Sequence, residues 1–187
     1  MEIKNRCSWC TQDKIYQDYH DYERWKPVHN DRILFELLIL EWAQAGLSRL
    51  TILKKREQYR KAFDNFDVQK VANYNKKKYN ELLDNKWIIR NKLKIQSAIQ
   101  NAKVFIEIQK EFGSFDRYIW DFVDNKVIKN TGKNSKKVPT KTPLSDKVAK
   151  DLQTKWMSFV GSTIIYAYIQ AIGMVNTHTQ DCDLYNS

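Results

Sequence analysis

The stretch "LILEWAQAGLSR", residues 38–49, joins an apolar segment to a turn of small residues and then to a basic segment. The apolar run begins near Ile33, so a helix over residues 31–42 is expected to lie in the protein core. Glu41 follows this run, and a buried carboxylate destabilises the fold unless it finds hydrogen-bond donors. Glu41 therefore either lines a pocket, where it would accept a hydrogen bond from an amine and favour a cationic ligand, or is a partly exposed residue at a helix end.

Helical periodicity dominates the rest of the chain, and strand signals are poor. The pattern predicts an all-α domain of about ten short helices in two lobes, with Asp31 and Ser145 as helix N-caps. Further helices are expected over 50–66, 68–74, 77–85, 91–112, 115–123, 146–156 and 158–175. Residues 125–143 are polar and basic and contain two prolines, so they are expected to be irregular. Residues 1–187 are interpreted as a single domain.

The charge balance narrows the class of partner. The chain has 32 Lys and Arg against 22 Asp and Glu, a formal net charge of +10. This excess favours an acidic partner, nucleic acid above all, although a solvated basic surface would give the same composition. No stretch is long and apolar enough to span a membrane, and the N-terminus has no apolar signal core. We therefore expect a cytoplasmic protein, associated with the nucleoid through DNA, that does not bind membranes.

Two thiols and two imidazoles near the chain ends form a candidate metal site. His178 and Cys182 have a spacing that can direct both side chains at one point, and Cys7 and His20 lie near the other terminus. Such a set suits a closed tetrahedral zinc site that ties the termini together. Cys10 forms a C-x2-C pair with Cys7 and could replace His20, and three unliganded cysteines would explain the same residues.

Two further features are consistent with DNA binding. Residues 8–25 are rich in aromatic rings that could sandwich a base extruded from the duplex, or could simply pack in the core: Trp9, Tyr16, Tyr19, Tyr22 and Trp25. Residues 82–99 read as a helix, a short turn and a basic helix starting near Asn91. The N-terminus of that second helix could hold a DNA phosphate, with Arg90, Lys92 and Lys94 nearby, although many helical hairpins are only structural.

Taken together, these motifs resemble the DNA-3-methyladenine glycosylase I family of the helix-hairpin-helix DNA glycosylase superfamily. The resemblance covers nearly the whole chain, in family order and spacing. Its carriers are "RCSW", "YQDYHDYE", "LFELLILE", "QAGLS", "TILKKREQYRKAF", "IIRNKLKI" and "FVGSTIIYAYIQAIGMVNTH". The implied fold is a helix-hairpin-helix glycosylase bundle with a zinc site joining its ends.

The resemblance implies a monofunctional base excision repair enzyme that hydrolyses the N-glycosidic bond of 3-methyladenine in alkylated DNA and leaves an abasic site. Its partners would be alkylated double-stranded DNA and free 3-methyladenine, the protein would be a monomer, and its zinc would be structural. The implied zinc ligands are Cys7, His20, His178 and Cys182. The implied base pocket maps onto Trp9, Tyr16, Tyr19, Glu41 and position 49, with no residue assigned as a general base. Leu47 could enter the gap left by the flipped nucleotide, or could merely end a core helix.

Six residues depart from the family pattern. Arg24 and Arg49 stand where the family has tryptophan, and tryptophan stands where glycine is usual at positions 25, 42, 87 and 156. A guanidinium at position 49 would repel a cationic base, and Trp87 falls in the hairpin turn, where glycine permits positive φ and close approach to a phosphate. Read literally, these changes predict a catalytically impaired DNA-binding relative. A zinc-containing helical module that binds RNA or protein is a second alternative.

One hypothesis removes all six departures together. Only two kinds of change occur, glycine to tryptophan and tryptophan to arginine, whereas drift should scatter among many residues. If UGA encodes glycine in the source and an arginine CGN codon encodes tryptophan, the gene has been translated with the wrong codon table. Ordinary UGG codons at positions 42 and 87 would contradict this hypothesis.

Overall fold

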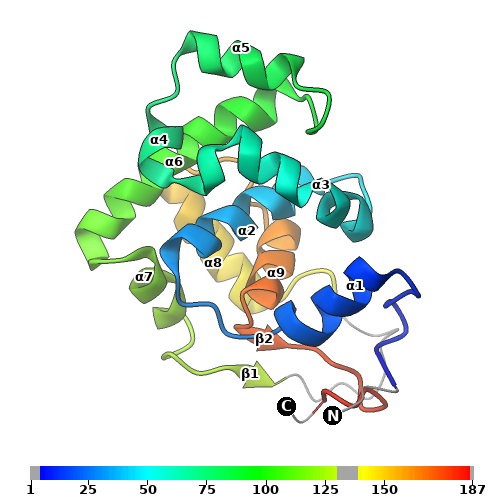
Figure 1. The fold of residues 1–187 in the computed structure, drawn as a ribbon. Coiled ribbons are helices and arrows are strands. Elements are labelled where there is room, and N and C mark those ends of the chain that lie inside the picture. Colours follow the sequence, from blue (N-terminus) through cyan, green and yellow to red (C-terminus); the bar gives the residue numbers. More distant parts are fainter. Residues whose placement is uncertain (1–4, 130–138, 186–187) are drawn as a thin grey trace.

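The computed structural model describes residues 5–129 and 139–185, and it is built almost entirely of helices (Figure 1). In chain order the helices are α1 (Lys14–Asp18), a π-helix (Tyr19–Glu23), α2 (Asp31–Ala43), α3 (Arg49–Ala62), a 3₁₀ turn (Asp64–Phe66), α4 (Val68–Ala72), α5 (Lys76–Asp84), α6 (Lys92–Phe112), α7 (Phe115–Asp121), α8 (Pro143–Thr154) and α9 (Ser162–Ala171). Two short strands, β1 (Ile128–Lys129) and β2 (Val175–Asn176), pair in parallel. The expected all-α class is confirmed. No helix within the described ranges is long and apolar enough to cross a membrane.

Helix α2 is the centre of the core. Its residues from Leu34 to Ala43 are all buried, and it packs against α9, α6 and α7. Figure 1 shows α2 in the middle of the molecule, with α5 at one end of the bundle and α1 near the other. Because every face of α2 is covered from Leu34 onward, its sequence there is apolar all round, and its two buried charged residues, Glu36 and Glu41, need partners inside the protein.

The helix starts differ from the sequence expectation at two N-caps. Asn30 caps α2 by accepting a hydrogen bond from the amide of Ile33, whereas Asp31 accepts from the amides of Phe115 and Asp116 in the first turn of α7, whose N-cap is Ser114. Thr142, rather than Ser145, caps α8, with Ser145 completing a capping box. In both cases the expected capping side chain lies inside the helix, where its oxygen serves another backbone amide.

The expected helix over residues 158–175 is wrong in its extent. The chain is irregular from Met157 to Val160, and α9 starts only at Ser162. Asn101, buried on α6, donates to the Ser158 carbonyl at 2.9 Å and accepts from the Ser158 amide at 2.8 Å. The Asn101 side chain therefore forms hydrogen bonds with the Ser158 amide and carbonyl, which would otherwise be bonded within a helix. In the stretch 125–143, β1 and the first residue of α8 are ordered elements, and residues 130–138 lie outside the described part.

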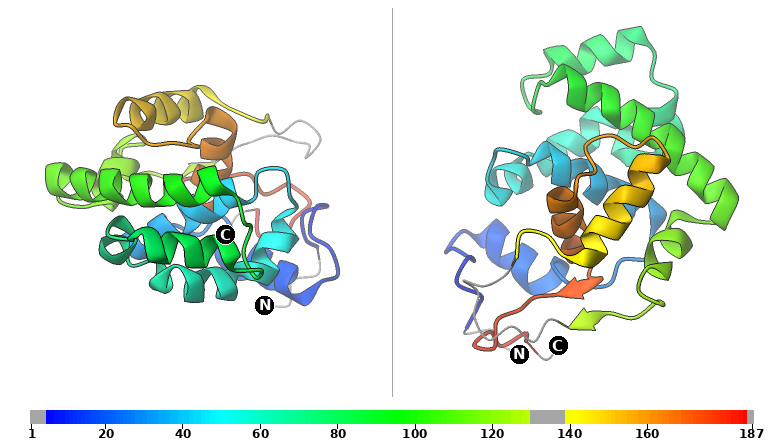
Figure 2. Two further views of the ribbon diagram at one scale, coloured as in Figure 1. Left: turned by 90° about the horizontal axis from the view of Figure 1, so that it is seen from above. Right: turned by 180° about the vertical axis from the view of Figure 1, so that it is seen from behind.

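The first and last described segments lie side by side at one end of the molecule, as the right-hand view of Figure 2 shows, and the Asp183 amide donates to the Asn5 carbonyl at 3.0 Å. The segment after α9 packs tightly on residues 26–28: Val28 donates to the Ile172 carbonyl at 3.0 Å, and a Cβ at Gly173 would lie 2.2 Å from the Lys26 backbone. Gly173 also has a φ of +76°, which favours glycine. This close approach brings residues 176–182 beside the π-helix.

Candidate base-binding and metal sites

The carboxylate of Glu41 is buried and paired with Arg49. Glu41 is only 3% exposed, so the alternative of a partly exposed glutamate at a helix end is wrong. Arg49 donates from Nη1 to Oε1 at 2.5 Å and from Nη2 to Oε2 at 2.6 Å. Burial lowers the pKa of Arg49, but the Glu41 carboxylate more than offsets this, so the pKa of the guanidinium is raised. This arrangement is a bidentate buried ion pair.

The turn after α2 sets this pairing. Gly46 has a φ of +83°, a conformation that favours glycine, and Leu47 donates to the Gln44 carbonyl at 2.7 Å. Ser48 then caps α3. The chain therefore reverses between Glu41 and Arg49 and brings the first residue of α3 back over the end of α2.

One aromatic ring lies against this ion pair, and two more lie nearby. The Arg49 guanidinium lies 5.5 Å from the centre of the Tyr19 ring, and Tyr19 is buried. Trp9 and Tyr16 are half-buried, with ring centres 5.1 Å apart. Burial raises the pKa of Tyr16, and the nearby charges of Arg49 and Arg24 partly oppose that rise. The structure thus places Tyr19 beside the Glu41–Arg49 pair, Tyr16 within range of the Arg49 charge, and Trp9 against Tyr16.

Arg24 and Gln170 are also part of this site, although the sequence pattern did not predict a role for them there. Arg24 donates to the Tyr19 hydroxyl at 3.2 Å and to the Gln170 side-chain carbonyl at 2.6 Å, and its Cζ lies 5.4 Å from the Trp9 ring centre. Gln170 is a buried polar residue in the otherwise apolar α9. That single polar position in "IIYAYIQAIG" was the available signal.

The π-helix explains how neighbouring residues serve two sites. Its wider turn closes through the amide of Arg24, which donates to the Tyr19 carbonyl at 2.8 Å. Tyr19 faces the ion pair, while His20 and Asp21 are buried toward the chain ends. π-helical turns are rare and occur frequently at functional sites. Apolar periodicity does not reveal such a turn.

Leu47 and Lys94 lie next to the turn of residues 44–48. Leu47 is 40% exposed, so the alternative that it ends a core helix is wrong; its insertion into DNA stays a prediction. The Lys94 ammonium donates to the carbonyls of Ala43 and Ala45 at 3.3 and 3.2 Å. Burial lowers the pKa of Lys94. Lys94 therefore links the start of α6 to this turn, a contact that the sequence did not predict.

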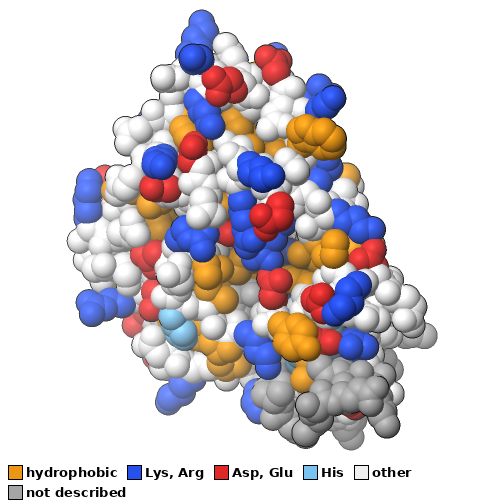
Figure 3. Space-filling view, in the orientation of Figure 1, with side chains coloured by type: hydrophobic (Ala, Val, Ile, Leu, Met, Phe, Trp, Pro, Cys, Tyr) orange, Lys and Arg blue, Asp and Glu red, His pale blue; other side chains and the backbone are white. Residues whose placement is uncertain are grey.

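The expected hairpin is the α5–turn–α6 pair. Arg90, Asn91 and Lys92 are exposed, and Asn91 caps α6 by accepting from the Lys94 amide. Trp87 is 57% exposed, and its carbonyl accepts from the Lys55 ammonium at 3.1 Å. Positive φ at position 87 is not observed. On the face in Figure 3, basic side chains are spread among acidic ones instead of forming one continuous patch.

Cys7, His20, His178 and Cys182 form one buried group that could hold a metal ion. Their ligand atoms all lie within 4.8 Å of one another, and the site joins the two chain ends. His178 Nδ1 lies 3.4 Å from Cys7 Sγ and 3.3 Å from Cys182 Sγ, and His20 Nε2 lies 3.6 Å from Cys182 Sγ. Tetrahedral bonding at zinc's usual Zn–S and Zn–N lengths places S and N about 3.5 Å apart. Cys10 is not in this group.

Charged side chains support the metal-ligand group from outside. His20 Nδ1 lies 2.8 Å from Asp21 Oδ1, and Arg6 holds the same carboxylate at 2.7 Å. Carboxylates commonly orient a histidine ligand in this way. Burial raises the pKa of Cys7, but hydrogen bonds to His178 and His20 outweigh it and lower the pKa to about 5. Cys7 therefore favours the thiolate form that binds metals.

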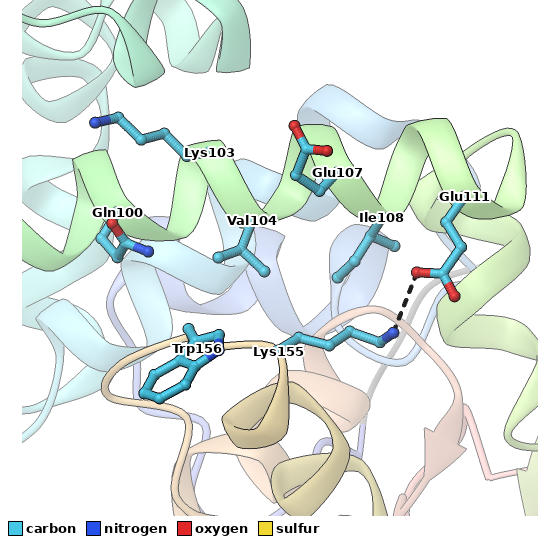
Figure 4. Close-up of a pocket in the computed structure, with 8 residues that line it drawn as sticks. All are labelled: Gln100, Lys103, Val104, Glu107, Ile108, Glu111, Lys155 and Trp156. Carbon is cyan, nitrogen blue, oxygen red and sulfur yellow. Dashed lines mark hydrogen bonds and ion pairs between the residues drawn. The ribbon is translucent and has the colours of Figure 1, made fainter.

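A separate groove of about 290 Å³ runs along α6 beside the end of α8 (Figure 4). Trp156 and Lys155 border it, and Lys155 pairs with Glu111 at 3.3 Å. None of its lining residues belongs to the group around Glu41 or to the cysteine–histidine group. We therefore place the candidate chemistry at Glu41 and not in this groove.

A buried carboxylate close to aromatic rings suits the binding of a planar cation, and the class of protein that the comparisons with known proteins define is a DNA glycosylase. The methyladenine glycosylase family matches residues 9–186, and the chain belongs to it. A DNA-3-methyladenine glycosylase of Haemophilus influenzae is 40% identical over 180 residues, 96% of this chain and 97% of that protein.

Solved structures agree with this assignment. A crystal structure of 3-methyladenine DNA glycosylase I has a TM-score of 0.92 at 42% identity and covers 96% of this chain and 98% of that one. The Staphylococcus aureus enzyme, studied for its recognition of 3-methyladenine, has a TM-score of 0.93 at 30% identity, covering 98% and 97%.

Proposed function

We propose that this protein is a monofunctional DNA repair glycosylase that removes 3-methyladenine from alkylated double-stranded DNA. The observation that carries the proposal is the buried Glu41 carboxylate, whose partner Arg49 lies over the Tyr19 ring, with the Tyr16–Trp9 pair nearby. Family membership and the named activity of its relatives support it. Products would be an abasic site and free 3-methyladenine, and the protein would act as a cytoplasmic monomer on the nucleoid.

The chemistry needs selection more than acid catalysis. Methylation at N3 gives the adenine a positive charge, so the base already leaves readily. A carboxylate among aromatic faces favours this cation over neutral adenine, through charge attraction and cation–π contact. Water adds to C1′ and loses a proton, while the electrons of the N9–C1′ bond pass to the base and neutralise it. The flipped position requires unstacking, for which Leu47 is positioned as a wedge.

Zinc is the metal that fits the cysteine–histidine group best. Two thiolates and two imidazoles complete a closed tetrahedral site, and a closed site is structural because no open position is left for water or substrate. Zinc bound there would hold the two chain ends together and so fix the π-helix that carries Tyr19. DNA would be held in part at the α5–α6 hairpin, through Arg90, Asn91 and Lys92.

One observation favours the alternative of a catalytically impaired DNA-binding relative. Arg49 already neutralises Glu41 in this sequence. The test is therefore a release assay on methylated duplex DNA with three proteins: the chain as written, a variant with tryptophan at 24 and 49 and glycine at 25, 42, 87 and 156, and that variant with Glu41→Gln.

We expect the six-position variant to release 3-methyladenine and the chain as written to be much slower. Glu41→Gln should lower release at least about tenfold, since it removes the charge that selects the cation. Absence of release by the six-position variant, with zinc bound and the fold intact, would contradict the proposed function.

A further inference from the structure

The Arg49 side chain has the contacts of a bound ligand. Its guanidinium is planar and cationic, its side chain is 10% exposed, and both of its terminal nitrogens donate to the two Glu41 oxygens. The Cζ atom of the group lies over the Tyr19 ring, 5.5 Å from the ring centre. A carboxylate on the edge and an aromatic ring on the face are the two contacts that a planar cation needs.

The surroundings hold Arg49 in this place. Arg49 begins α3, and the turn of residues 44–48 returns the chain directly over Glu41. Glu41 lies on the fully packed α2 and is 3% exposed, so it cannot turn to another partner in solvent. Arg24 donates to the Tyr19 hydroxyl at 3.2 Å and so helps to hold that ring in place. A second cation therefore finds both oxygens of Glu41 already used.

We propose that Arg49 is an internal ligand of the base subsite, which takes planar cations and is closed to them while Arg49 is in place. This inference deepens the proposed function and rests on it only for the identity of the natural ligand. Specificity at this position follows from competition: an external cation must displace a neighbouring side chain that is always present at high effective concentration.

The test compares the chain as written with Arg49→Ala, Arg49→Lys and the control Arg60→Ala. Arg60 is a matched control, since it also pairs with a buried glutamate, Glu36, at 2.8 Å, and Arg56 keeps that glutamate paired when Arg60 is removed. Two probes are used: methylguanidinium at millimolar concentration, read as a rise in melting temperature against sodium chloride, and free 3-methyladenine, read by tryptophan fluorescence.

We expect methylguanidinium to stabilise Arg49→Ala and to leave the chain as written and Arg60→Ala unchanged. 3-Methyladenine should bind Arg49→Ala at least about 100-fold more tightly than the chain as written, because no buried ion pair has to be broken. Arg49→Lys keeps Glu41 paired but loses the planar fork, so its affinity should lie between these two. If Arg49→Ala does not fold, Arg49→Lys decides the question.

The outcomes separate the two proposals. Equal binding of 3-methyladenine by the chain as written and by Arg49→Ala overturns the inference about Arg49 and leaves the proposed function intact. Binding of methylguanidinium without binding of 3-methyladenine supports the inference about Arg49 and contradicts the proposed function. Failure of both probes to bind Arg49→Ala overturns the inference.

Discussion

A double-mutant cycle on Glu41 and Arg49 measures the ion pair at the centre of the site. Glu41→Gln keeps the shape of the side chain but leaves the Arg49 guanidinium buried beside a neutral amide. Arg49→Leu leaves the carboxylate unpaired in the core. Removing one partner of a buried pair typically costs about 3–5 kcal/mol, and the side chains here are 1% and 10% exposed, so solvent cannot replace the lost partner.

Each single substitution should therefore lower the free energy of unfolding by about 3–5 kcal/mol, or the melting temperature by about 6–20 °C for a domain of this size. The double variant has no unpaired charge, so its loss should be about 3 kcal/mol smaller than the sum of the two single losses.

Urea unfolding, followed by tryptophan fluorescence and circular dichroism, gives the four free energies. The control is Glu57→Gln, which breaks an exposed ion pair with Arg60 and should cost less than about 0.5 kcal/mol. Additive losses within about 0.5 kcal/mol would refute the reasoning, since they would show that Glu41 and Arg49 do not interact in the folded protein.

Three further predictions follow from other parts of the molecule. Burial raises the pKa of Glu36, but Arg60 and Arg56 outweigh it and depress the pKa below its ordinary value of 4.5. The ion pairs of the Glu36 carboxylate therefore stabilise the folded protein fully above that pH, and this stabilisation is lost as the pH falls through the lower pKa of the folded state. Glu36→Gln should flatten an acid unfolding curve over this range. Metal analysis should find one zinc ion per chain. Cys182→Ser should lose the zinc and melt at a lower temperature, whereas Cys10→Ser should retain it. Equal metal content in the two variants would exclude the assigned ligands. Trp156→Gly should raise the free energy of unfolding by about 1 kcal/mol because it relieves a φ of +69°, whereas Trp87→Gly, where φ is not positive, should not; an equal change in both would exclude backbone strain as the cause.

The long helices were predictable because their signals are local and repeated. The apolar run of residues 33–40 and the periodicity of residues 91–112 predicted α2 and α6 to within about one residue. The metal-ligand group was also accessible, since thiols and imidazoles are few and their spacing is distinctive. The nomination of Glu41 depended on one anomaly, a carboxylate at the end of an apolar helix, together with the family resemblance.

The parts that the sequence did not predict depend on contacts between distant segments. The Asp31 carboxylate accepts from the amide of Phe115 in α7, 84 residues along the chain, instead of capping its own helix. Asn101 on α6 interrupts the expected last helix at Ser158. The π-helix at Tyr19 and the bond from Arg24 to Gln170 likewise join residues whose relation no local periodicity expresses. At Asp31, Asn101 and Arg24 a polar side chain supplies the hydrogen bond that joins the two segments, whereas the π-helix closes through the backbone amide of Arg24.

The tryptophans themselves separate into two groups, and this bears on the codon hypothesis. Trp120 donates its indole N–H to the Val28 carbonyl at 2.9 Å, and Trp9 packs against Tyr16. The four tryptophans at positions where the resemblance implies glycine are instead anomalous. The φ angle is positive at Trp25 and Trp156, and the buried indole N–H groups of Trp25 and Trp42 have no acceptor among the described residues. Trp87 and Trp156 are 57% and 80% exposed.

Position 156 carries the clearest backbone signature of glycine. The amide of Met157 donates to the Leu152 carbonyl at 3.0 Å, and the amide of Trp156 donates to the Gln153 carbonyl at 3.0 Å. These two bonds, with a left-handed residue between the end of α8 and the following chain, form the helix-ending motif in which glycine is strongly preferred because a side chain there is strained. The fold therefore favours glycine at 156 independently of any comparison with relatives. A UGA codon for glycine that was translated as tryptophan would account for this strain. An arginine CGN codon that encodes tryptophan in the source would account for the guanidinium that closes the base subsite.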